Sequence, residues 1–174
     1  MNGKISIVVP AHNEEKRIGA MLDLYIDFFR RLKTQGLLFE IVVVMNACSD
    51  RTREVIEARR AKEIKILEFK QGGKGFAVIR GFEDALKRDA TVIGFVDADA
   101  ATSPAAFYHL LMHLRNNDGV IASRYIQGSI MRPRPTWQRV IVSRAYNASS
   151  SPVATALTGA LATGAIVSGA ATCN

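Results

Sequence analysis

The sequence alternates short apolar runs with longer segments in which apolar residues recur every three or four positions. Runs rich in β-branched residues predict buried strands, and the 3.6-residue period predicts amphipathic helices between them. We expect five strands, at residues 4–9, 39–44, 64–69, 91–96 and 119–123. Strands that alternate with helices form right-handed βαβ units. The sequence therefore predicts an α/β fold, a three-layer α/β/α sandwich around a mostly parallel sheet.

Polar residues mark where several of the helices should begin. Asn13 is expected to cap the first helix, and Ser49 or Asp50 the second. The pair Ser103-Pro104 combines a good N-cap residue with proline at the first helical position. These signals place the helices directly after loops that follow strands.

Composition is that of one folded domain. The chain has 174 residues, of which 48% are hydrophobic, enough for a substantial core. Its two cysteines, Cys48 and Cys173, make no disulfide framework, so a reducing compartment is expected. Met1 leads directly into a strand pattern without a secretory signal. We therefore expect a cytoplasmic location.

The net charge of +7 is unevenly distributed along the chain. No acidic residue follows Asp118, but five arginines do: Arg124, Arg132, Arg134, Arg139 and Arg144. This segment should attract phosphates, anionic lipid or nucleic acid, or else it solubilises the surface. Peripheral contact with the cytoplasmic membrane face is left open. Nucleic-acid binding is disfavoured, because only Tyr125 and Trp137 interleave with the arginines and no recognised module is present.

The C-terminal segment changes character. Residues 145–174 carry no charged side chain and are rich in Ala, Ser, Thr and Gly. Residues 152–172 are long enough to span a bilayer, although few Leu, Ile and Val residues make insertion marginal. The alternatives are a flexible or truncated end, and a helix packed through small residues such as Gly169. We expect a domain at residues 1–147 and an atypical tail at 148–174.

The loops that follow the expected strands are rich in polar and charged residues. They are Pro10-Ala11-His12-Asn13-Glu14, Asn46-Ala47-Cys48-Ser49-Asp50, Gly72-Gly73-Lys74-Gly75, Asp97-Ala98-Asp99 and Ser123-Arg124-Tyr125. Ligands of open α/β sheets bind beyond the carboxyl ends of the strands. We expect all five loops to converge on one edge of the sheet, which makes this edge the candidate site.

Individual motifs at this edge have a functional and a plain interpretation. Asp97 and Asp99 offer hard oxygen ligands for Mg²⁺ or Mn²⁺ and the phosphates it carries, or form a solvated turn. Gly73-Lys74-Gly75 is not a Walker loop, because no Ser or Thr follows the lysine. Its glycines would let a ligand approach the backbone closely, and its lysine would supply one positive charge. The plain interpretation is a turn that leads into a helix. His12 is placed to contact a base or ribose, or is a solvated loop residue.

Taken in order, these motifs resemble family 2 glycosyltransferases with the GT-A fold. Residues 8–15, Val-Val-Pro-Ala-His-Asn-Glu-Glu, look like the opening motif of the family, and residues 46–52 resemble its Asp-Asp-Gly-Ser-x-Asp-x-Thr loop. Gly73-Lys74-Gly75, Asp97-Ala98-Asp99 and residues 122–125 follow in family order. The resemblance covers residues 4–147 and is greatest to the dolichyl-phosphate mannose and glucose synthases.

The resemblance implies a role for each matching position. The implied substrate-binding residues are Pro10, Ala11, His12, Asn13, Glu14, Val44, Asn46, Lys74, Asp97, Ala98, Asp99 and Arg124. Asp97 and Asp99 are also the implied metal ligands for Mg²⁺ or Mn²⁺ and, with Arg124, the implied catalytic residues. Lys74 and Arg124 would supply positive charge near phosphates or the sugar.

Three departures from the family pattern are visible. Asn46 replaces the usual Asp, which bears on base recognition. Ala101 stands where the mannose synthases carry a metal-binding Gln, which bears on metal coordination. No Asp-Thr-Gln-Cys-Gly-like acceptor segment lies between Tyr146 and Asn174.

The resemblance implies transfer of a hexose from a nucleoside diphosphate sugar, of the UDP-glucose or GDP-mannose type, to a polyprenyl phosphate. The transfer would be metal-assisted and would invert the anomeric carbon. The alternative is a catalytically silent nucleotide-sugar binding module, or a fragment that lacks the acceptor half. The sequence does not fix the oligomeric state.

Overall fold

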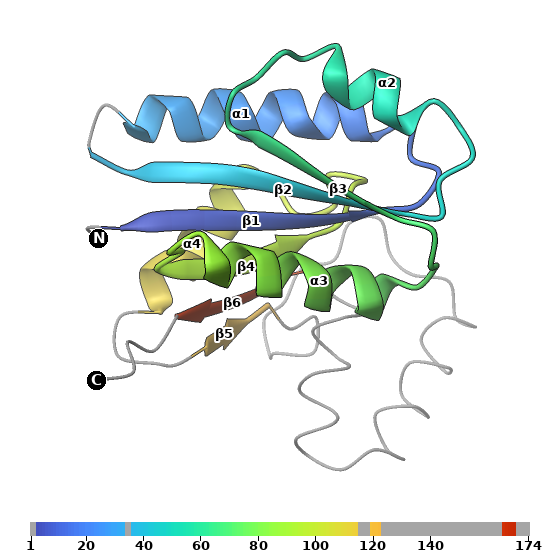
Figure 1. Cartoon of the computed structure of the whole chain (residues 1–174). Helices are drawn as coiled ribbons and strands as arrows, with labels where there is room; N and C mark the ends of the chain where they lie inside the picture. The colour runs from blue at the N-terminus through green and yellow to red at the C-terminus, as the bar shows by residue number, and fades with distance from the viewer. Residues whose placement is uncertain (1–2, 34–35, 115–118, 123–164, 170–174) are drawn as a thin grey trace, which may run out of the picture.

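The computed structural model describes residues 3–33, 36–114, 119–122 and 165–169. A six-stranded sheet in the order β3-β2-β1-β4-β6-β5 forms the middle layer, with helices on both faces (Figure 1). This arrangement confirms the predicted three-layer α/β fold.

Four parallel strands form the part of the sheet that the alternating sequence pattern predicted. They are β1 (Lys4–Ala11), β2 (Leu38–Asn46), β3 (Ile64–Phe69) and β4 (Val92–Val96). β1 and β2 lie next to each other at the centre and are almost entirely buried. Continuous apolar runs are typical of such strands, because helices cover both of their faces.

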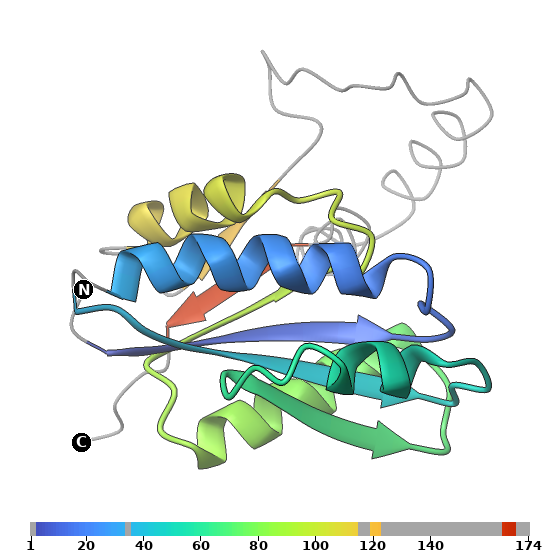
Figure 2. The ribbon, with the colours of Figure 1, turned by 90° about the horizontal axis from the view of Figure 1, so that it is seen from above.

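The helices divide unequally between the two faces. On one face pack α1 (Ile18–Lys33), α2 (Thr52–Glu57) and α4 (Pro104–His113), and on the other packs α3 (Lys74–Lys87). Figure 2 shows α1 and α4 side by side over the sheet. Each face therefore has its own apolar core.

Successive side chains of β1 point to opposite faces of the sheet and so contribute to different cores. Ile7 and Val9 belong to the core beneath α1, where the aromatic rings of Phe29 and Phe107 pack, while Val8 points to α3. A Cβ atom on Gly81 would lie 2.3 Å from Val8 Cγ1, so glycine allows α3 to approach β1 directly. This contact fixes the position of the helix whose first residue is Lys74.

The remaining strands are β5 (Gly119–Ile121) and β6 (Ala165–Gly169). β5 confirms the strand expected at 119–123. β6 was not expected: it lies between β4 and β5 and pairs with both in antiparallel orientation. Gly169 therefore lies in a strand, and of the alternatives for this segment the helix packed through Gly169 is wrong. Only two residues of this strand, Ile166 and Val167, are β-branched, and the small residues around them weaken the strand signal in the sequence.

The other interpretations of the uncharged segment concern residues largely outside the described part. Of residues 152–172, the structure describes only 165–169. Within the described ranges, no helix is both long and apolar enough to cross a membrane.

Two of the three expected helix starts differ in detail. Ser103 caps α4 as predicted, because its Oγ accepts a hydrogen bond from Ala106 N at 3.2 Å. Asn13 does not cap α1, which begins only at Ile18; its backbone is left-handed (φ 55°). Arg51 occupies the N-cap position of α2. Asp50, one residue earlier, accepts a hydrogen bond from the N–H of Thr52, the first residue of the helix.

Candidate active site

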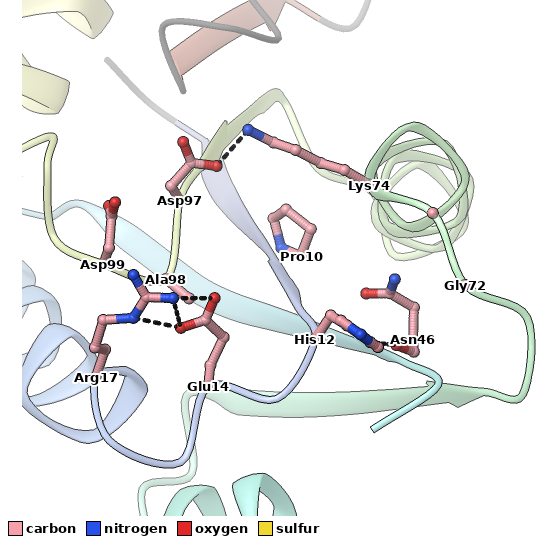
Figure 3. A pocket seen from close by; sticks show the side chains of 11 residues that line it. Pro10, His12, Glu14, Arg17, Asn46, Gly72, Lys74, Asp97, Ala98 and Asp99 are labelled. Carbon is pink, nitrogen blue, oxygen red and sulfur yellow. Dashed lines mark hydrogen bonds and ion pairs between the residues drawn. The ribbon is translucent and has the colours of Figure 1, made fainter. Parts of the chain in front are cut away.

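A cavity of about 420 Å³ opens where the carboxyl ends of β1, β2 and β4 meet the turn before α3 (Figure 3). It is lined by Pro10, His12, Glu14, Arg17, Asn46, Gly72, Gly73, Lys74, Asp97, Ala98 and Asp99. Four of the five loops expected at one sheet edge converge here. The fifth, with Arg124, lies outside the described residues.

Three of the residues expected to bind substrate do not line the cavity. Ala11 and Val44 are fully buried in the two apolar cores, because they occupy inward-facing positions at the ends of β1 and β2. Asn13 turns toward the neighbouring loop, where its Oδ1 accepts a hydrogen bond from Ser49 N at 2.8 Å. These residues support the walls of the cavity.

His12 is held against the end of β2. Its Nδ1 lies 2.7 Å from the backbone oxygen of Asn46. A carbonyl oxygen only accepts hydrogen bonds, so Nδ1 carries a proton. In the neutral ring Nε2 is then an acceptor, suited to a hydroxyl or N–H group of a ligand.

Side-chain hydrogen bonds join the loop after β1 to the loop after β2. Glu14 N donates to Thr52 Oγ1 at 2.8 Å, Glu15 N donates to Asp50 Oδ2 at 3.0 Å, and Arg51 N donates to Glu15 Oε2 at 3.1 Å. Burial raises the pKa of Asp50, but hydrogen bonds from Thr52 and Glu15 outweigh it and hold the pKa below its ordinary value. The two loops thus form one unit that carries His12 and Glu14.

Ion pairs organise the charge of the cavity. Lys74 Nζ lies 2.6 Å from Asp97 Oδ1, and Arg17 binds Glu14 through two hydrogen bonds of 2.8 and 2.9 Å. Figure 3 shows both ion pairs. Asp99 accepts a hydrogen bond from Ala101 N at 2.9 Å and is exposed. Sequence reasoning missed Arg17, although an acidic and a basic residue three positions apart can pair across a single turn.

The donor set fits a divalent cation only if a substrate supplies further ligands. In the described part of the chain, no group of three or more His, Cys, Asp or Glu side chains is arranged to hold a metal. Asp97 is neutralised by Lys74, whereas Asp99 offers a hard, exposed carboxylate oxygen. Mg²⁺ bound to substrate phosphates commonly uses only one or two protein carboxylates. Asp99 meets that requirement.

Curated relatives match most of the chain. The chain is 32% identical over 143 residues to a dolichol-phosphate mannosyltransferase of Pyrococcus furiosus, covering 79% of this chain and 38% of the relative. It is 35% identical over 124 residues to a dolichyl-phosphate beta-glucosyltransferase of Dictyostelium discoideum, covering 66% and 37%. The chain thus spans less than two fifths of the length of these relatives.

A solved structure shares the fold. Glucosyl-3-phosphoglycerate synthase from Mycobacterium tuberculosis, crystallised with Mn²⁺, uridine diphosphate and phosphoglyceric acid, superposes with a TM-score of 0.58 at 19% identity. The match covers 96% of this chain and 56% of that one.

A family model described as glycosyl transferase family 2 matches residues 6–160. The chain therefore belongs to glycosyltransferase family 2.

Proposed function

We propose that this chain binds a nucleoside diphosphate sugar in the cavity and transfers its hexose, with inversion, to a polyprenyl phosphate. The observation that carries the proposal is that His12, Asn46, Lys74 and Asp99, from four separate loops, line one cavity. A base and ribose would lie against Pro10 and His12, and the diphosphate near Lys74 and Asp99. The names of the two curated relatives support a lipid-linked phosphate as acceptor.

The reaction needs little help from a general base. An oxygen of the acceptor phosphate is already negative, and it forms the new bond to the anomeric carbon. The bond from that carbon to the diphosphate breaks, and its electron pair leaves with the diphosphate. Catalysis therefore consists mainly of stabilising the charge that develops on the leaving group.

Residues of the cavity are suited to that task. Asp99 would hold Mg²⁺ or Mn²⁺, which when bound neutralises charge on the diphosphate. Lys74 would exchange its contact with Asp97 for the leaving phosphate, and Asp97 would then be free for the ribose or sugar. Arg124 would add positive charge. Arginines after Asp118 would contact anionic lipid at the cytoplasmic membrane face, and each would add about 1 kcal/mol to the free energy of membrane binding.

A nucleotide-sugar binding module without turnover is the second candidate. It is favoured by the lack of a recognisable acceptor motif between Tyr146 and Asn174 and by Ala101, which offers no ligand where the mannose synthases carry a metal-binding Gln. Incubation with a nucleotide sugar and a polyprenyl phosphate separates the two. Formation of the lipid-linked sugar supports the enzyme, whereas binding without product supports the module.

Calorimetric titration with UDP-glucose and GDP-mannose, with and without Mn²⁺, tests the donor site. We expect Asp99→Ala to abolish the Mn²⁺-dependent part of binding and to lower any transfer rate about 10²–10³-fold, because one electrostatic contact to the leaving group is lost. The thermal midpoint should barely change, since Asp99 is exposed. Glu83→Ala, which removes an exposed carboxylate from α3, is the control and should leave binding intact.

Absence of binding to any nucleotide sugar by well-folded protein would refute the donor site. A large loss of stability in Asp99→Ala would instead make this residue structural.

A further inference from the structure

Asn46 lies at the junction of three loops and is almost fully buried, with 3% of its surface exposed. It is the last residue of β2. Its two side-chain polar atoms lie 2.7 Å from Ala11 O and 3.0 Å from Gly73 N, and its backbone oxygen accepts a hydrogen bond from His12 Nδ1. The chemistry of these neighbours assigns the amide nitrogen to the Ala11 side and the amide oxygen to the Gly73 side. Figure 3 shows Asn46 between His12 and the turn at Gly72. One residue thus joins the ends of β1 and β2 to the turn before α3.

An amide is the group that these two neighbours require. The Ala11 carbonyl can only accept a hydrogen bond, and the Gly73 N–H can only donate one. The side chain between them must therefore donate on one side and accept on the other. An ionised aspartate accepts only, so it would leave the Ala11 carbonyl facing a buried negative oxygen.

The turn held by Asn46 determines where Lys74 lies. Gly73 has φ 123° and ψ 123°, a backbone conformation that L-residues rarely adopt. Lys74 follows directly as the first residue of α3, and its ammonium group pairs with Asp97. A hydrogen bond at Gly73 N therefore fixes the backbone one residue before the cavity's lysine.

We propose that Asn46 is a positioning residue: it holds the Gly72–Lys74 turn so that Lys74 reaches the diphosphate of the donor, and it does not read the nucleobase. Both of its polar side-chain atoms already have protein partners, which leaves the amide committed to the turn. The inference rests on the proposed function, because it takes the diphosphate as the ligand of Lys74.

A pair of ligands that differ only in the base tests this role. Calorimetry in the presence of Mn²⁺ compares UDP or GDP, whichever the wild type binds, with ribose 5-diphosphate, which keeps the ribose and diphosphate. We expect Asn46→Asp to weaken both ligands by the same factor of about 10, equivalent to about 1.4 kcal/mol. If Asn46 instead contacted the base, the substitution would weaken binding of the nucleotide and leave binding of ribose 5-diphosphate unchanged.

Two further variants sharpen the comparison. Gln71→Glu makes the same amide-to-carboxylate change two residues before Gly73, but Gln71 is exposed and does not line the cavity; we expect both affinities to stay within about twofold. Gly73→Ala strains the same turn directly, because alanine rarely adopts a φ of 123°. It should weaken binding of both ligands equally while leaving Asn46 unchanged. It keeps the test open if Asn46→Asp folds poorly.

A double-mutant cycle tests the route through the lysine. If Asn46 acts by positioning Lys74, Asn46→Asp should cost little further affinity once Lys74→Met is present. Additive losses, or a loss confined to the nucleotide, would overturn the inference while leaving the proposed function in place. Failure of the wild type to bind any nucleoside diphosphate or its sugar would overturn both.

Discussion

Replacing Asp50 by asparagine should loosen the contact between the loops after β1 and β2. The Asp50 carboxylate accepts hydrogen bonds from Glu15 N at 3.0 Å, Thr52 N at 3.0 Å and Thr52 Oγ1 at 2.5 Å. An asparagine retains one acceptor oxygen, which can serve Thr52. Its NH₂ group would then face the Glu15 N–H, so that two donors oppose each other.

The cost follows from that unsatisfied donor. Leaving a partly buried polar group without its partner costs about 1–3 kcal/mol. For a chain of this size, 1 kcal/mol shifts the melting temperature by about 2–4 °C, so Asp50→Asn should melt roughly 2–12 °C below the wild type at pH 7. Glu57→Gln, which alters an exposed carboxylate paired with Arg53, should cost less than about 0.5 kcal/mol.

The same pair of proteins gives a signed dependence on pH. The folded-state pKa of Asp50 is held below its ordinary value of 3.8, because hydrogen bonds to the carboxylate outweigh the effect of burial. A depressed pKa contributes stability that is fully present above the unfolded pKa and is lost as pH falls through the folded pKa. The stability gap between wild type and Asp50→Asn should therefore be constant from pH 7 to about 5 and narrow below pH 3.8.

Urea unfolding followed by circular dichroism at pH 7, 5 and 3 measures both effects. The reasoning fails if Asp50→Asn is no less stable than Glu57→Gln, since the loop contact would then contribute nothing. It also fails if the gap persists unchanged at pH 3, because proton binding to Asp50 in the unfolded state should by then have reduced the stability that the depressed pKa contributes.

Two further predictions concern the scaffold. Glu40 accepts hydrogen bonds from Ser6, Lys4 and Arg88; burial raises its pKa, but these groups outweigh it and lower the pKa below 4.5. Glu40→Gln should cost about 1.5–3 kcal/mol in urea unfolding at pH 7 and less as the pH falls below 4.5; an equal cost at pH 3 would contradict this. Gly81→Ala should destabilise by about 1–3 kcal/mol, because its Cβ would meet Val8. Gly75→Ala, on the same helix with open space around it, should be neutral or stabilise by up to about 1 kcal/mol. Equal effects of the two glycine substitutions would show that the close approach of α3 is not limiting.

The sequence predicted the parallel part of the fold because its signals are local. β1 and β2 contain long apolar runs, and the helices between strands carry apolar residues at helical spacing. β6 escaped prediction for the opposite reason. Its residues, Ala165–Gly169, belong to a low-complexity segment, and their strand conformation depends on pairing with β4, about seventy residues earlier in the sequence.

The candidate site was predictable in outline, since parallel strands bring their loops to one edge. Its internal contacts were not. Asn13 was expected at the start of α1, but its side chain instead accepts a hydrogen bond from Ser49 in the loop after β2. Glu15 likewise contacts Asp50 and Arg51 in that loop. Such contacts depend on the relative placement of two loops, which no local pattern encodes.

The buried Glu40 network and the candidate ligand site lie at opposite ends of the same strands. The buried Glu40, with Lys4 and Arg88, ties β1, β2 and the end of α3 together at the amino ends of the parallel strands. The cavity occupies the carboxyl ends, where Lys74 begins α3. Because α3 runs from one end to the other and is seated on β1 at Gly81, the ionic network can hold the helix while the lysine at its first residue exchanges partners. Changes at Glu40 should therefore alter the free energy of unfolding without altering relative affinities for ligands, and changes at Lys74 should do the reverse.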